Sequence, residues 1–112
     1  MDDNDLQLPT IKETLKKNNV KINKSLGQNF LFDLNLTDKI VKNSEPICPT
    51  VIEIGPGPGG LTRSILKKKP TVLYTIDKDK QSEKMLTDVK KIYKDRLIII
   101  TEDALHYPIW KL

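Results

Sequence analysis

Apolar residues in this chain follow two patterns: short continuous runs, and residues spaced three or four positions apart. The continuous runs lie at residues 51–54, 71–77 and 96–101, and they are rich in the β-branched and aromatic side chains that strands favour. Because helical spacing fills the intervals between the runs, the pattern predicts parallel strands joined by crossover helices. That arrangement is typical of the α/β class.

Helices are predicted over residues 61–69 and 80–93. The second of these has four apolar residues on one side: Met85, Leu86, Val89 and Ile92. A further helix is expected upstream of the first strand, capped by Asp33 or Asn35. Its apolar stripe is formed by Leu36, Ile40 and Val41, with Lys39 and Lys42 on the solvent side.

The pattern breaks most sharply after the first predicted strand, where residues 55–60 read G-P-G-P-G-G. Glycine tolerates positive φ and close backbone approach, and proline fixes the turn, so this stretch predicts a rigid, open loop. The following helix would point its first N–H groups into the loop, where they can hold the polar or anionic part of a nucleotide-like cofactor. The alternative is a glycine turn that only lets a helix pack on a sheet.

Acidic residues follow the predicted strands at the same edge of the sheet. Gly55, Gly57 and Gly60 satisfy G-x-G-x-x-G, and Asp77 is placed to accept hydrogen bonds from ribose hydroxyls, so a dinucleotide-binding fingerprint is formally met. Asp103 follows the third strand. Since ligands of open α/β sheets bind at the carboxyl ends of the strands, Gly55, Asp77 and Asp103 are expected to converge on one crevice.

Residues 24–31, K-S-L-G-Q-N-F-L, predict a ligand-facing loop. The amides of Gln28 and Asn29 offer donors and acceptors that suit an amino-acid group carrying an ammonium and a carboxylate. Phe30 and Leu31 either line an apolar wall or anchor the loop.

These features together resemble a known family. Glu53 followed by x-Gly-x-Gly-x-Gly resembles the first motif of methyltransferases that use S-adenosyl-L-methionine. With K-S-L-G-Q-N-F-L, E-I-G-P-G-P-G-G-L-T-R and D-A-L in this order, residues 24–112 resemble the ribosomal RNA adenine dimethyltransferase family. Erythromycin-resistance rRNA methyltransferases and mitochondrial transcription-factor homologues share that fold.

The resemblance implies a Rossmann-like class I methyltransferase fold, here truncated after about three parallel strands. It implies S-adenosyl-L-methionine as cofactor and N6 of adenines in small-subunit ribosomal RNA as target. Asp77 stands where the family usually has a glutamate that accepts from both ribose hydroxyls. Asp103 would accept from the adenine amino group, and the backbone of neighbouring residues such as Ala104 would contact the ring edge.

The family's catalytic segment, similar to Asn-Leu-Pro-Tyr, would lie beyond Leu112, so no catalytic residue is assigned here. The chain is expected to supply the cofactor-binding half and to be inactive alone. Two other hypotheses remain. The chain could be a non-enzymatic cofactor- or RNA-binding remnant, or a nicotinamide-dependent oxidoreductase half-domain.

The distribution of charge leads to the hypothesis that part of the chain binds RNA. The net charge is +4, and residues 12–24, part of which predicts a short helix, carry five lysines and one glutamate. Clustered lysines gain affinity for nucleic acid by releasing counterions, so they are either RNA contacts or a solvated face. The candidate RNA contacts are Lys16, Lys17, Lys21 and Lys24.

We expect residues 1–23 to be a disordered tail and basic segment, and residues 24–112 to be the amino-terminal part of a catalytic domain. One cysteine and no long apolar run or apolar leader predict a cytoplasmic protein without disulfides or membrane contact. The expected partner is ribosomal RNA of the small subunit, and no metal is expected.

Overall fold

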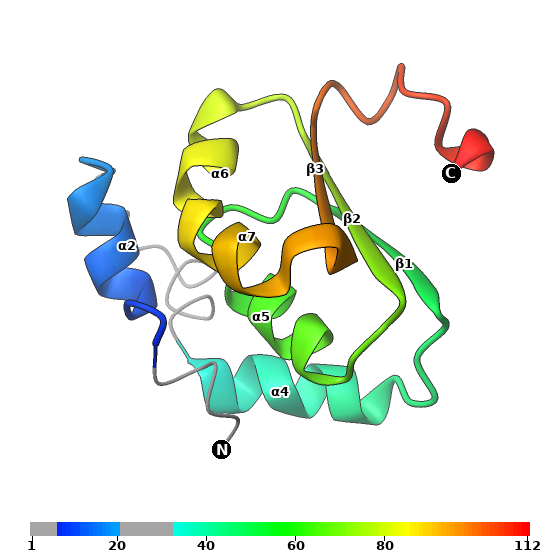
Figure 1. The fold of residues 1–112 in the computed structure, drawn as a ribbon, viewed down its shortest axis with the longest axis horizontal. Helices are drawn as coiled ribbons and strands as arrows, with labels where there is room; N and C mark the ends of the chain where they lie inside the picture. The colour runs from blue at the N-terminus through cyan, green and yellow to red at the C-terminus, as the bar shows by residue number, and fades with distance from the viewer. Residues whose placement is uncertain (1–6, 21–32) are drawn as a thin grey trace.

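The fold is a three-stranded parallel sheet with helices packed on it (Figure 1). The computed structural model describes residues 7–20 and 33–112. The strands are β1 (Thr50–Ile54), β2 (Val72–Asp77) and β3 (Leu97–Thr101), in the spatial order β1-β2-β3. The helices are α2 (Ile11–Lys17), α4 (Leu34–Asn43), α5 (Gly60–Lys67), α6 (Lys80–Met85) and α7 (Thr87–Tyr93), with short 3₁₀ turns η1 (Lys94–Arg96) and η2 (Ile109–Lys111). The predicted α/β class is confirmed.

The strand register brings the three carboxyl ends to one edge of the sheet. Ile54 pairs with Ile76, and Ile76 pairs with Ile100. Gly55 continues the ladder, because its N–H donates to Ile76 O at 2.9 Å. The residues that follow the three strands therefore start side by side.

The helices cover one face of the sheet, as Figure 1 shows for α5, α6 and α7. Two crossovers that run in the same direction place their helices on the same side when both are right-handed. Leu73, Leu97, Leu66 and Val89 are buried between sheet and helices. On the sheet's other face, Ile54 and Ile98 remain 62% and 37% exposed.

The predicted helix over residues 80–93 is interrupted, so the prediction of one continuous helix is wrong. α6 ends at Met85 and α7 begins at Thr87. Leu86 between them is fully buried, and its Cδ2 lies 2.8 Å from the position that a Cβ on Gly59 would occupy. The interruption therefore coincides with the packing of Leu86 near Gly59, and no helix-breaking residue lies at this position.

Two aspartates cap helices, and one of them, Asp33, was predicted to cap α4. Asp33 caps α4 by accepting from the N–H groups of Asn35 and Leu36, and Asp79 caps α6 by accepting from Gln81 N at 2.9 Å. α5 starts after Gly59, whose φ is +96°.

The amino-terminal helix is attached to the rest of the fold. Ile11 and Leu15 of α2 form a buried cluster with Met85. Arg63 of α5 is buried, and it donates to Pro9 O at 2.6 Å. Leu8, which precedes α2, packs against the main core. Among the helices of the described ranges, none combines the length and apolar character needed to span a membrane.

Candidate functional site

The glycine loop after β1 is left uncovered on one side by the residues that the structure describes. Gly55 and Gly57 have φ values of +70° and +54°, in the left-handed region that glycine adopts at least cost. Apart from the glycine itself and its two chain neighbours, no atom of residues 7–20 and 33–112 lies within 4 Å of a Cβ built on either residue. Side chains at these positions would therefore project into the space in front of the loop, which is where a ligand would approach.

Asp77, at the end of β2, accepts two hydrogen bonds. Asp79 N donates to Asp77 Oδ1 at 3.0 Å, and Ser82 Oγ donates to Asp77 Oδ2 at 2.6 Å. A carboxylate has about four acceptor positions, so the described residues leave about two of them for a ligand's hydroxyl groups. Sequence reasoning missed Ser82, although an acid at the strand end with a serine five residues later, in the next helix, was a visible signal.

Asp103 lies in the turn after β3. Its Oδ1 accepts from Leu105 N at 3.0 Å, and its backbone oxygen accepts from the N–H groups of His106 and Tyr107. His106 Nε2 is 3.9 Å from Asp103 Oδ2, and the imidazole is 84% exposed. The aspartate therefore shapes the turn that carries the half-buried Ala104.

Glu53 in β1 is a buried acid beside the glycine loop. It is 7% exposed, and its Oε1 accepts from Thr62 Oγ1 of α5 at 2.6 Å. Burial raises the pKa of Glu53 to about 7, and the Thr62 hydrogen bond opposes that rise. The contact ties the strand before the loop to the helix after it.

Five predicted cofactor-binding residues thus lie at the ends of adjacent strands: Gly55, Gly57, Asp77, Asp103 and Ala104. We call this set the strand-end site. The other three, Gln28, Asn29 and Leu31, lie outside the described residues. An open backbone cradle beside a carboxylate with spare acceptor positions fits a ligand that carries ribose hydroxyls.

The predicted RNA-binding lysines are only partly described. Lys16 and Lys17 are exposed on α2, and Lys17 forms an ion pair with Asp88 at 3.2 Å. Lys21 and Lys24 lie outside the described residues. The positive charge of this segment is therefore reduced by one neighbouring carboxylate.

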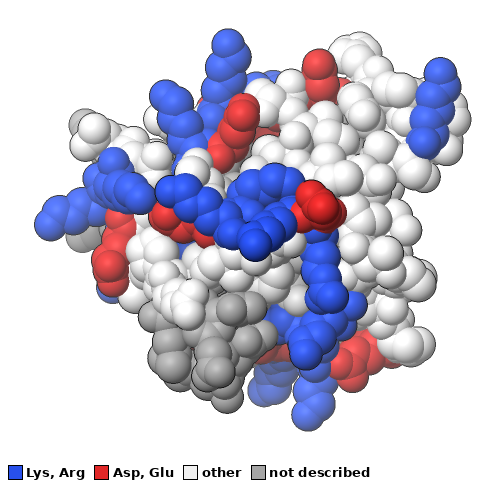
Figure 2. Space-filling model, in the orientation of Figure 1, with Lys and Arg blue, Asp and Glu red and all other residues white. Residues whose placement is uncertain are grey.

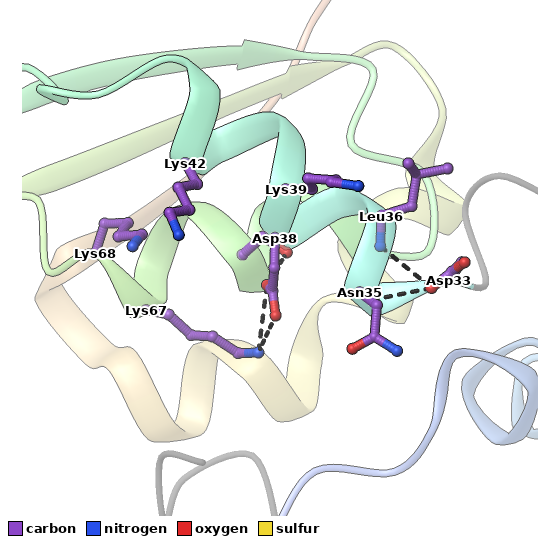
Figure 3. Close-up of a pocket in the computed structure, with 9 residues that line it drawn as sticks. Asp33, Asn35, Leu36, Asp38, Lys39, Lys42, Lys67 and Lys68 are labelled. Atoms are coloured by element: carbon purple, nitrogen blue, oxygen red, sulfur yellow. Dashed lines mark hydrogen bonds and ion pairs between the residues drawn. The ribbon is translucent and has the colours of Figure 1, made fainter.

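A cavity of about 580 Å³ lies away from the strand-end site, between α4 and α5 (Figure 3). None of the strand-end residues lines it. Its basic residues are Lys39, Lys42, Lys67 and Lys68, and we call the cavity the lysine groove. Across residues 7–20 and 33–112, no three His, Cys, Asp or Glu side chains are grouped so that they could hold a metal ion.

Curated relatives of this chain are ribosomal RNA methyltransferases. Ribosomal RNA small subunit methyltransferase A of Bartonella bacilliformis is 46% identical over 106 residues, and that of Agrobacterium fabrum is 43% identical over 99 residues. The alignments cover 94% and 88% of this chain but 38% and 36% of those relatives. The chain thus spans little more than a third of the length of the relatives it matches.

A solved structure shares the fold. A candidate S-adenosyl-L-methionine-dependent methyltransferase from Methanococcus maripaludis matches with a TM-score of 0.59 and 21% sequence identity. The match covers 88% of this chain and 44% of that one, which confirms the predicted Rossmann-like methyltransferase fold. The family model for ribosomal RNA adenine dimethylase matches residues 19–111 and confirms the resemblance noted from the motifs. The chain therefore belongs to the ribosomal RNA adenine dimethylase family.

Proposed function

We propose that the strand-end site binds S-adenosyl-L-methionine, and that this chain supplies the cofactor-binding half of an enzyme that dimethylates N6 of adenines in small-subunit ribosomal RNA. The observation that carries the proposal is the open glycine loop at Gly55 and Gly57 beside Asp77, a carboxylate with spare acceptor positions. The names of the curated relatives support the substrate, which would place the activity in the cytoplasm.

Each predicted residue has a role in this proposal. Gly55 and Gly57 would leave room for the methionine end of the cofactor, with Gln28, Asn29 and Leu31 contacting the same end. Asp77 would accept hydrogen bonds from the ribose hydroxyls. Asp103 would accept from the adenine amino group, and the backbone at Ala104 would contact the ring edge.

Direct methyl transfer requires no covalent intermediate with the protein. S-adenosyl-L-methionine would supply a methyl group on a sulfonium, for direct transfer to a nucleophilic nitrogen with the neutral thioether as leaving group. The protein has to hold both reactants in line and to exclude side reactions. The strand-end residues hold the cofactor side of that alignment. The 112 residues contain no Asn-Leu-Pro-Tyr-like segment, so we assign none of them to the target adenine.

We also propose the chain's division from the same resemblance. Residues 24–112 would form the amino-terminal part of the catalytic domain, and residues 1–23 would precede it as a basic segment that contributes to RNA binding.

Calorimetry with S-adenosyl-L-methionine and with NAD tests the proposal. We expect one cofactor molecule to bind per chain and NAD to give no binding heat. Binding of NAD without S-adenosyl-L-methionine would replace the proposal with a nicotinamide-dependent oxidoreductase, which the glycine pattern and Asp77 also allow.

Transfer of labelled methyl groups to small-subunit ribosomal RNA tests how the work is divided. We expect this chain to bind the cofactor and to transfer no label by itself. Label at adenine N6 would show that the chain holds both reactants, and the assignment of a cofactor-binding half would be wrong.

A further inference from the structure

The lysine groove is not used by the function proposed above. Its volume of about 580 Å³ is within the range of roughly 300 to 1,000 Å³ that is usual for ligand sites. Its charged lining residues are four lysines and two aspartates, so its formal charge is positive. Figure 2 shows basic side chains over the middle and the lower part of the molecule, with acidic side chains among them.

Polar contacts between α4 and α5 fix the walls of the groove. Ser64 is buried, and its Oγ lies 2.5 Å from Asp38 Oδ1 and 2.7 Å from Thr37 Oγ1. Lys67 Nζ lies 3.0 Å from Asp38 Oδ2. Asp38 is thus bound by donors of α5, and its negative charge is matched by Lys67.

The remaining lysines differ in how their charge is balanced. Lys68 pairs with Glu45 at 2.7 Å, and both side chains are partly exposed. Lys39 and Lys42 are exposed, and no carboxylate of residues 7–20 and 33–112 lies within ion-pair distance of either. The other aspartate of the lining, Asp33, uses its Oδ1 to cap α4. Two unpaired cations therefore remain at the groove.

These cations are spread along the groove. Figure 3 shows Lys42 and Lys68 pointing toward each other from α4 and the end of α5, while Lys39 lies nearer the start of α4. Lys42 and Lys68 alone could hold one small anion, but Lys39 lies apart from them and would not reach the same anion. Charges distributed along a helix suit a chain of phosphates, which lysines bind with release of counterions.

We propose that the lysine groove binds the phosphate backbone of the RNA substrate, an inference that rests on the proposed function for the identity of that substrate. Lys39 and Lys42 would each contact a phosphate. Lys68 would contribute when it exchanges Glu45 for phosphate.

The test measures binding of small-subunit ribosomal RNA to the chain at several salt concentrations. Replacing two phosphate-contacting lysines, as in Lys39→Gln with Lys42→Gln, should weaken binding and lower the salt slope by about 1.4 to 1.8. Lys84→Gln with Lys91→Gln is the matched control. It removes the same charge from exposed positions in the last turns of α6 and α7, and it should leave the slope unchanged.

Two further variants separate binding from folding. Lys39→Arg with Lys42→Arg should keep the affinity. Glu45→Gln removes the carboxylate that competes for Lys68 and should strengthen RNA binding, a gain that a folding defect cannot produce. An equal slope change in the groove and control variants, or no RNA binding by the parent chain, would overturn the proposal.

Other occupants give different results. Saturable binding of inorganic phosphate, or of polyglutamate in preference to RNA, that is lost in the groove variant would overturn the assignment to RNA. Binding of S-adenosyl-L-methionine is measured on the same samples. If the unmutated chain did not bind S-adenosyl-L-methionine, the proposed function would be contradicted. An RNA affinity that is unchanged in the groove variant would contradict only this inference.

Discussion

The strand-end site and the lysine groove are both polar, but they satisfy their carboxylates in opposite ways. At the strand ends, Asp77 receives hydrogen bonds from a hydroxyl and a backbone N–H. In the groove, Asp38 receives one from a hydroxyl and an ion pair from Lys67. Neutral donors leave the negative charge of an acid in place, whereas a lysine cancels it. The first region therefore keeps acceptors for ribose hydroxyls, and the second keeps cations for phosphate.

Gly55→Val should produce the largest effect, and this effect should be confined to cofactor binding at the strand-end site. A β-branched side chain at φ +70° is strained, and it would fill the open space before the loop. We expect binding of S-adenosyl-L-methionine to fall below detection in calorimetry, with RNA affinity retained. Lys39→Gln with Lys42→Gln should give the reverse pattern. Unaltered cofactor binding by the valine variant, with a normal melting temperature, would contradict the placement of the site.

The free energy of unfolding should depend on pH, because Glu53 is buried and its pKa is raised. Its pKa is about 7 in the folded chain because burial disfavours the charged form, against an ordinary value of 4.5. The folded state therefore holds the proton more tightly, and the contribution of Glu53 to the free energy of unfolding should be highest below pH 4.5. It should fall by up to about 3 kcal/mol as the pH rises toward 7.

Glu53→Gln should flatten this dependence, because an amide does not ionise. Denaturant unfolding between pH 4.5 and 8 measures it. The pKa of Glu45 is lowered by its hydrogen bond to Lys68 and by that lysine's charge, so Glu45 acts in the opposite direction at lower pH. A stability that is independent of pH in the parent would show that Glu53 is ionised without penalty.

Asp77→Ala should weaken cofactor binding by about 1.5 to 3 kcal/mol, the range for hydrogen bonds to a charged group. Ser82→Ala should cost less, about 0.5 to 1.5 kcal/mol, because it removes only the donor that orients Asp77. Calorimetry measures both values. If the serine variant lost more affinity than the aspartate variant, Asp77 would not be the group that contacts the ribose.

The lysines of the basic segment of residues 12–24 should give the smallest effect. Replacing Lys16, Lys17 and Lys21 by Gln should lower the salt slope of RNA binding by at most about 0.7 to 0.9 for each lysine that contacts a phosphate. Lys17 is already paired with Asp88, so we expect less than three full contributions. A larger decrease than in the groove variant would move the main RNA contact to that segment.

Local patterns predicted the strands and the alignment of their carboxyl ends well, because the strands depend on neighbours in sequence. Continuous apolar runs define β1 to β3, and parallel register then aligns their ends. The contacts that shape the site were not predicted. Thr62 on Glu53 and Ser82 on Asp77 each join a strand to the next helix, and helical periodicity does not reveal which face a hydroxyl uses.

Contacts between segments that lie far apart in the sequence could not be predicted from local patterns. The lysine groove joins helices whose lysines are more than twenty positions apart, and each lysine alone reads as a solvated side chain. Arg63 is another example, since its burial depends on Pro9 and Thr14 of the amino-terminal segment. The interruption at Leu86 likewise accompanies packing near Gly59.

An NMR titration of the ¹⁵N-labelled chain with S-adenosyl-L-methionine tests the central claim most directly, because it locates the bound cofactor residue by residue. We predict saturable shifts of the amides of Gly55, Gly57, Asp77 and Ala104, and no shifts at Lys39 and Lys42. Shifts confined to the lysine groove, or none at the glycine loop under saturating cofactor, would contradict the assignment of the strand-end site.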